Sequence, residues 1–137
     1  MQKFVVLLLS GLSVVAGAAA GCATGETPKG AETVAGQKTV TGQVIDLYCY
    51  DVKNKTNTGR DHRQGRECAW ACVKWEGQPV GLLAADGTVY QLAGDLVADN
   101  NAKIAPHVTH TVTITGDVTE KDGMQMLTAS DVKMVSE

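Results

Sequence analysis

The strictest pattern in the chain is an alternation of threonine with aliphatic residues near its C-terminal end. In the segment THTVTITGDV, residues 109–118, Val112, Ile114 and Val118 fall on one side and threonines on the other. A period of two places alternate side chains on opposite faces of a strand. The segment therefore predicts a half-buried β-strand, and with it a mainly β domain.

Two earlier segments also have the composition of strands. Residues 39–50 are rich in residues that favour strands, and their apolar phase slips near Gly42–Ile45, which suggests a bulge in a bent strand. Residues 79–92 contain two apolar runs on either side of Asp86-Gly87, a pair that suits a type I′ turn. We therefore expect a first strand followed later by a hairpin.

A helix is expected over residues 66–75. Spacings of three and four separate Cys68, Ala71, Cys72 and Trp75. One helical face therefore carries both cysteines, and the same phase places Trp75 toward the core and Trp70 toward solvent. The intervening residues 51–65 are polar and are predicted to form a loop.

The second half of the chain adds a short helix and a last turn. Residues 95–107 are a helix candidate that Pro106 stops. After the threonine-rich strand, Lys121-Asp122-Gly123 turns the chain, and residues 124–135 return as one or two strands.

The first 21 residues have the organisation of a signal peptide. Lys3 is the only charge before Glu26, an apolar stretch follows it, and small residues crowd the end of that stretch. Ala19-Ala20-Gly21-Cys22 resembles the bacterial lipobox, although Ala19 stands where that motif usually has leucine. The resemblance implies a lipoprotein that is cleaved before Cys22 and lipidated on it.

The lipobox resemblance also implies a location. The protein would be exported and anchored to the bacterial envelope, and Ala23 after the cysteine favours the outer membrane, facing the periplasm, where two membranes exist. Residues 22–38 are then the lipidated N-terminus and a flexible tether, because they are rich in Gly, Thr, Ala and Glu. Residues 39–137 form one small domain. The net charge of −3 for the whole chain argues against nucleic-acid binding.

The closing segment HTVTITGDVTEKDGMQMLTASDVKMV, residues 110–135, is similar to the last two strands of small bacterial OB-fold domains. The resemblance implies a five-stranded barrel, with the Cys-bearing helix inserted after strand one and a second short helix before the last two strands. The order Cys, H-x5-C-A-x2-C and G-x-P-x-G also resembles a group of small exported bacterial proteins with no firm biochemical role. OB barrels bind many kinds of ligand, so the fold alone does not set the function.

Four side chains that suit soft metal ions lie within 24 residues. They are Cys49 at the end of the first strand, His62 on the loop, and Cys68 and Cys72 on the helix. Thiolate and imidazole ligands in a set of four are typical of tetrahedral zinc, and the same donors suit Cu(I). The sequence thus predicts a zinc or copper site, held by a lipid-anchored, non-enzymatic envelope domain.

A disulfide is the alternative interpretation of the same cysteines. Lipidation would occupy Cys22 and leave three, and cysteines of exported domains are often bridged. Residues i and i+4 of a helix lie about 6 Å apart along its axis, whereas a disulfide needs Cβ atoms about 3.8 Å apart. Cys49 would then pair with Cys68 or Cys72, in an OB-like adaptor or ligand-binding domain without metal.

Other chemistry has less support in the sequence. A thiol redox protein is a second alternative, with Arg66 and a helix N-terminus near Cys68 to favour a thiolate. His107 and His110 are expected at a loop or helix end, and whether either joins the cysteine cluster stays open. No signature of a hydrolase or a nucleotide enzyme is present, and the envelope protein or small ligand that the domain binds is not specified.

Overall fold

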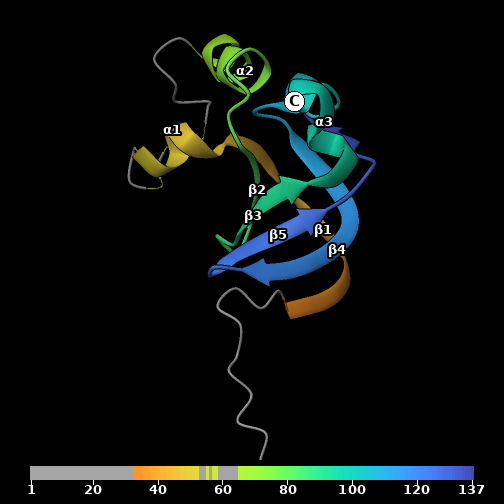
Figure 1. Cartoon of the computed structure of the whole chain (residues 1–137). Coiled ribbons are helices and arrows are strands. Elements are labelled where there is room, and N and C mark those ends of the chain that lie inside the picture. Colours follow the sequence, from red (N-terminus) through yellow and green to blue (C-terminus); the bar gives the residue numbers. More distant parts are fainter. Residues whose placement is uncertain (1–32, 53–54, 56, 59–64) are drawn as a thin grey trace, which may run out of the picture.

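Figure 1 shows a computed structural model of the chain, which describes residues 33–52, 55, 57–58 and 65–137. Five strands make up the barrel: β1 (Thr33–Asp46), β2 (Val80–Ala84), β3 (Val89–Ala93), β4 (Thr111–Lys121) and β5 (Met124–Thr128). They are hydrogen-bonded in the order β1-β2-β3-β5-β4, and a pairing of β1 with β4 closes the barrel. The β3–β5 pairing is parallel, and the other four are antiparallel. The expected OB-like five-stranded barrel is confirmed.

The long strand β1 closes the barrel by pairing with two partners. Its residues from Thr33 to Gln43 pair with β4, and those from Gly42 to Asp46 pair with β2. β1 begins at Thr33, inside the segment that was assigned to the tether. The residues from 1 to 32, with the predicted signal peptide and Cys22, lie outside the described residues.

The bulge expected near Gly42–Ile45 is elsewhere, because the register of β1 shifts between Val34 and Gly36. The irregular apolar phase at the end of β1 has another cause. Val44 packs in the main core inside the barrel, and the next residue, Ile45, is buried in a second cluster. Both faces of this end of β1 are therefore covered, and a strand buried on both faces does not alternate.

A short helix, α1 (Leu47–Val52), covers that second face. Ile45 packs there with Leu47 and Tyr50, which α1 supplies. The first strand was expected to continue to residue 50, with a loop from residue 51, and α1 is a correction to that expectation. Cys49 consequently lies in a helix and not at the end of a strand.

The two Asp-Gly pairs make different turns. The hairpin of β2 and β3 is confirmed, but only Gly87 of its Asp86-Gly87 pair has a positive φ, with Gly87 N–H donating to Ala84 O and Ala84 N–H to Thr88 O. This is the three-residue loop with a glycine bulge and not a type I′ turn. The type I′ pattern occurs at Asp122-Gly123, where both φ angles are positive.

The helix predicted after Arg66 is confirmed as α2 (Arg66–Lys74). The helix expected over residues 95–107 is instead a broken series, in the order η1 (Gly94–Val97), α3 (Ala98–Asn101) and η2 (Ala105–His107). The break occurs because Asp99 and Asn100 have left-handed backbone angles, which Asp and Asn tolerate better than most residues. A last strand, β6 (Lys133–Ser136), pairs with the beginning of β4.

The helices α1, α2 and α3 gather at one end of the barrel, and β1 begins at the other (Figure 1). α2 closes this end by packing Ala69 and Val73 into the main core. Trp70 packs beside them, whereas Trp75 is 67% exposed. The expectation that Trp75 faces the core and Trp70 faces solvent is therefore wrong. Ala69 and Val73 face the barrel, and Cys72, on the neighbouring face of α2, lies beside Asp46 at the end of β1. In the described part of the chain, no helix is both long and apolar enough to cross a membrane.

Candidate metal centre

Asp46, the last residue of β1, is the centre of the site. Its Oδ1 accepts hydrogen bonds from the backbone N–H groups of Tyr48 at 3.0 Å and Cys49 at 3.3 Å. Asp46 is therefore the N-cap of α1, a position that aspartate favours because its carboxylate satisfies N–H groups of the first turn. The cap fixes the start of α1 and brings Cys49 to the side of the same carboxylate.

Leu47 and Gly81 set how closely α1 approaches the barrel. Leu47 N–H donates to Pro79 O at 3.0 Å, and its side chain lies over Gly81 of β2. A Cβ atom at Gly81 would lie 2.5 Å from Leu47 Cδ2, closer than real Cβ contacts. A side chain at this position would therefore have to displace the side chain of Leu47.

Hydrogen bonds from both ends hold α2 in place. At its C-terminal end, Asn101 Nδ2 donates to Val73 O at 2.8 Å and to Gln78 O at 3.1 Å. At its N-terminal end, Arg66 donates to Pro106 O at 2.6 Å and to Val108 O at 3.2 Å. These contacts tie α2 to the segment between β3 and β4 and fix the direction of its cysteine face.

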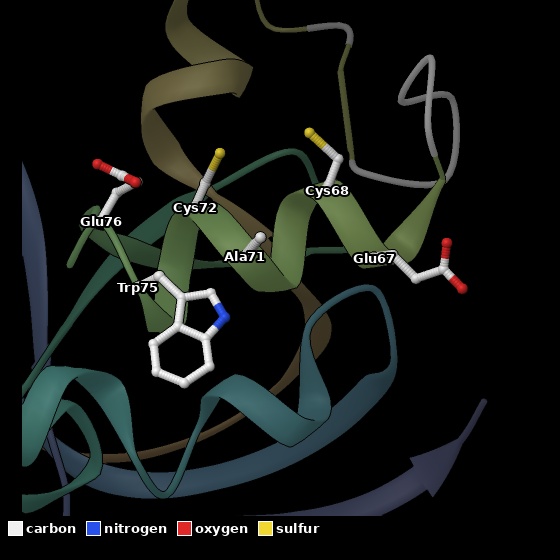
Figure 2. A pocket seen from close by; sticks show the side chains of 6 residues that line it. All are labelled: Glu67, Cys68, Ala71, Cys72, Trp75 and Glu76. Carbon is white, nitrogen blue, oxygen red and sulfur yellow. The ribbon is translucent and has the colours of Figure 1, made fainter.

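The cysteine face of α2 lines a shallow, open pocket. Its walls are formed by Glu67, Cys68, Ala71, Cys72, Trp75 and Glu76 (Figure 2). Cys68 and Cys72 point to the same side of the helix, as the sequence predicted. The exposed indole of Trp75 contacts Trp70 edge to face, with ring centroids 5.6 Å apart. The pocket gives solvent access to both thiols of α2.

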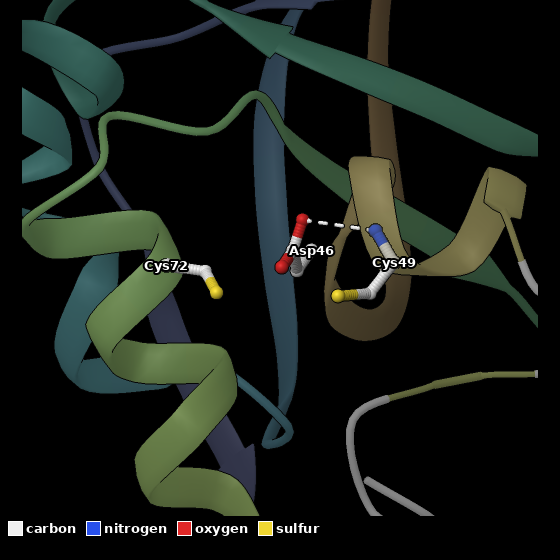
Figure 3. Close-up of side chains that lie close together, drawn as sticks. All are labelled: Asp46, Cys49 and Cys72. Atoms are coloured by element: carbon white, nitrogen blue, oxygen red, sulfur yellow. Dashed lines mark hydrogen bonds between the residues drawn. The ribbon is translucent and has the colours of Figure 1, made fainter.

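The two helices place their thiols on either side of Asp46 (Figure 3). One carboxylate oxygen of Asp46, Cys49 Sγ and Cys72 Sγ all lie within 4.8 Å of one another. Cys49 comes from α1, Cys72 from α2 and Asp46 from β1, so three elements meet here. Among the described residues, this is the only group of three or more such side chains close enough to hold one metal ion.

The carboxylate of Asp46 has an unusual environment. Asp46 is 1% exposed, and no N–H or O–H group of the described residues donates to its Oδ2. The Cys49 thiol is the hydrogen-bonding neighbour that remains, and thiols are weak donors. None of the salt bridges formed by the described residues involves Asp46. A buried carboxylate without a cation is costly, and metal coordination is one of the few ways to satisfy it.

The thiol pKa values follow from this environment. Burial raises the pKa of Cys49 to about 12, and hydrogen bonding to Asp46, the charge of Asp46 and the neighbouring thiols add to the effect. The pKa of Cys72 is also raised, first by burial and then by the charge of Asp46 and by contact with Cys68. Without a cation the thiols therefore keep their protons at neutral pH, and binding of a cation would displace them.

The fold brings some of the predicted metal ligands close together. Cys49 and Cys72 meet, and Cys68 lies beside them through its hydrogen bond to Cys72, but outside the 4.8 Å group. His62 lies outside the described residues. All three cysteines are present as thiols in this structure.

His107 and His110 form a separate pair, with ring centroids 6.5 Å apart. Neither belongs to the group around Asp46. The Nδ1 atom of each is buried without a hydrogen-bond partner among the described residues. Burial lowers the pKa of His107, and the charges of His110 and Arg66 lower it further.

Asp46 is a ligand candidate that was not predicted from the sequence. In the middle of an expected strand it resembles any other polar residue. The signal that points to it is an aspartate directly after an apolar run and before Leu-Tyr-Cys, which is the position of a helix N-cap.

Comparisons of the chain with protein-family models, with curated proteins and with solved structures find no match. The fold and the site therefore rest on the residues themselves. They comprise an OB-like barrel with an Asp/Cys/Cys group of a kind that can hold a metal ion.

Proposed function

We propose that this protein is a lipid-anchored domain of the bacterial envelope that binds zinc at the Asp46–Cys49–Cys72 group. The observation that carries the proposal is the buried carboxylate of Asp46, which lies beside two thiols and whose Oδ2 receives no N–H or O–H donor from the described residues. A divalent cation at this point would satisfy the carboxylate and stabilise both thiolates.

The donor set favours zinc over copper. Zinc accepts carboxylate oxygen and thiolate sulfur together, at about 2.0–2.2 and 2.3 Å. Cu(I) prefers sulfur donors, so a carboxylate at the centre of the site suits it less. Cys68, which hydrogen-bonds to Cys72, completes a tetrahedral set of four in this proposal. His62 stays a predicted ligand.

The distances are compatible with closure around one ion. Ligands of tetrahedral zinc that are about 2.3 Å from the metal lie roughly 3.8 Å from one another. The donor atoms of Asp46, Cys49 and Cys72 lie within 4.8 Å of one another in this structure. A contraction of about 1 Å is therefore enough, and rotation of the two cysteine side chains can supply it.

The arrangement of the barrel supports a site that faces away from the membrane. β1 leads from its beginning at Thr33 to Asp46, and the three helices surround the second end (Figure 1). A lipid on Cys22 would hold the protein near the beginning of β1. The metal group and the open pocket beside it would then face the aqueous compartment.

Two other functions receive less support. A redox enzyme needs a thiolate, and the pKa values of Cys49 and Cys72 are both raised in the metal-free protein. A disulfide-stapled adaptor without a metal site would bind no zinc after reduction, which the experiment below tests.

The test is the zinc content of the reduced full chain, purified in a mild detergent and dialysed against excess zinc. Elemental analysis should give one zinc per chain, and competition with a chromophoric chelator should give its affinity. Cys49→Ser and Cys72→Ser should each weaken binding by about 100-fold or more. Cys22→Ser removes a cysteine outside the group, so it is the matched control and should bind as the wild type does. A reduced protein that binds no zinc would refute the proposal.

A further inference from the structure

The three thiols near Asp46 differ in what they can bond to. Cys49 Sγ and Cys72 Sγ come from different helices and lie within 4.8 Å of each other. A disulfide has its sulfurs about 2.0 Å apart, so the pair must close by roughly 3 Å at most. Because the two residues come from different helices, rotation of their side chains and a small shift of one helix can bring the sulfurs together.

Cys68 and Cys72 are less suited to a bridge. They lie four residues apart in the intact helix α2, and so about 6 Å apart along its axis. Disulfides need Cβ atoms about 3.8 Å apart. The Cβ spacing of an intact helix therefore disfavours a Cys68–Cys72 bridge, although the two thiols are in contact.

A Cys49–Cys72 bridge and a bound zinc ion exclude each other. Both sulfurs of the Asp46–Cys49–Cys72 group would be used in the bridge, because a disulfide sulfur has lost the thiolate charge that binds the metal. Asp46, Cys68 and the predicted ligand His62 would remain, fewer than the four ligands of a structural zinc site. Oxidation of this pair would therefore empty the site.

We propose that the zinc site is a redox-controlled store that releases its ion when Cys49 and Cys72 form a disulfide. This inference rests on the proposed function and adds the regulation of the same site. Zinc is the released ligand, and a low-molecular-weight disulfide is the oxidant.

The reaction balances in two exchange steps. The Cys72 thiolate, which borders the open pocket, attacks one sulfur of the oxidant and forms a mixed disulfide, and the first oxidant thiolate leaves. The Cys49 thiolate then attacks Cys72 Sγ, the protein disulfide forms, and the second oxidant thiolate leaves. Two electrons pass from the two cysteine thiolates to the oxidant disulfide. Zn²⁺ leaves with its charge unchanged, and at neutral pH each leaving thiolate takes up a proton from water, because ordinary thiols have pKa values of about 8.5.

The pocket on α2 explains why the reaction begins at Cys72. Cys72 lines this open surface, so a small disulfide can approach its sulfur from solvent (Figure 2). Cys49 does not line the pocket, and its position across from Cys72 suits the second step (Figure 3). Bound zinc would keep both sulfurs as thiolates at neutral pH, so the loaded protein holds both in the reactive form.

The experiment treats the reduced, zinc-loaded full chain with oxidised glutathione. A chromophoric chelator measures the released zinc, and peptide mapping by mass spectrometry locates the bridge. We expect one zinc ion released for each Cys49–Cys72 bridge, and recovery of both thiols and zinc binding after reductant and zinc are added. Zinc that stays bound after the bridge has formed would overturn the inference, as would release accompanied only by glutathione adducts or by a Cys68–Cys72 bridge.

Two variants separate this inference from the proposed function. Cys68→Ser keeps Cys49 and Cys72 and should still couple bridge formation to zinc release. Cys49→Ser should form no bridge within the group, and a bridge between Cys68 and Cys72 in it would contradict the geometric argument. The zinc content before oxidation tests the proposed function alone. A protein that binds zinc but does not release it refutes only the redox control.

Discussion

Replacement of Asp46 by asparagine separates a metal ligand from a purely structural cap. Asn keeps the size of the side chain and an oxygen that can accept from Tyr48 and Cys49 N–H, and asparagine caps helices about as well as aspartate. It removes only the charge and one metal-binding oxygen. If Asp46 were merely the N-cap of α1, Asp46→Asn would behave as the wild type does.

The size of the expected shift in Tm follows from the linkage between zinc binding and folding. Free zinc at 100 times its dissociation constant stabilises the folded state by about 2.7 kcal/mol. A domain of this size gains roughly 4–8 °C in Tm for each kcal/mol, so zinc should raise the wild-type Tm by about 10–20 °C. With an affinity about 100-fold lower, Asp46→Asn at the same zinc concentration should gain only about 0.4 kcal/mol, or roughly 2–3 °C.

The assay is thermal unfolding of the reduced proteins, with and without zinc. Without zinc, Asp46→Asn should unfold at or above the wild-type temperature, because it removes a buried charge and keeps the cap. Asp86→Asn is the matched control: Asp86 Oδ1 also accepts a backbone N–H, from Thr88, but in the exposed β2–β3 turn. It should show the full zinc shift. An equal zinc shift in Asp46→Asn and the wild type would refute the role of this carboxylate.

Three further predictions concern the pH dependence of zinc binding, the buried His107 and the close contact at Gly81. Zinc affinity should rise by about 100-fold or more per pH unit between pH 6 and 8, because Cys49 and Cys72 each lose a proton on binding. Calorimetry in buffers of different ionisation enthalpy should detect the released protons, and an affinity independent of pH would contradict this. The pKa of His107 is lowered in the folded state, so the unfolded state binds a proton at a higher pH than the folded state does. The metal-free protein should therefore lose stability as pH falls through and below about 6.5. In urea titrations, His107→Gln should flatten this dependence. Gly81→Ala should destabilise the fold by about 1–3 kcal/mol and weaken zinc binding, because its Cβ would displace Leu47 and with it α1. A variant with an unchanged urea midpoint and zinc affinity would show that α1 does not depend on this contact.

The sequence also predicts a membrane anchor, which can be tested apart from the metal. The wild-type protein should partition with the membrane fraction after expression in a bacterium, and Cys22→Ser should be recovered outside it while keeping its zinc. Fractionation followed by mass spectrometry of the N-terminal peptide measures both the location and the lipid. Wild-type protein with an unmodified Cys22 would contradict the lipobox interpretation.

Much of the barrel could be predicted from the sequence, because strand signals are local. The alternation from Thr109 to Val118 and the two Asp-Gly turns depend on neighbouring residues, and they gave β4 and both hairpins. The spacing of Cys68 and Cys72 likewise placed both thiols on one face of α2. The turn type at Asp86-Gly87 was wrong, since the same dipeptide suits either of two hairpin loops.

The metal group was decided by tertiary structure. Asp46 is buried because α1 and α2 pack at one end of the barrel. No local sequence pattern indicates which face of β1 those helices will cover. The same packing explains the double-sided burial of Val44 and Ile45 and the exposure of Trp75. The sequence by itself determined which side chains can bind a soft metal and which helical face they share. Only the closed barrel determined that a carboxylate from β1 lies between them, because burial and proximity are properties of the whole fold.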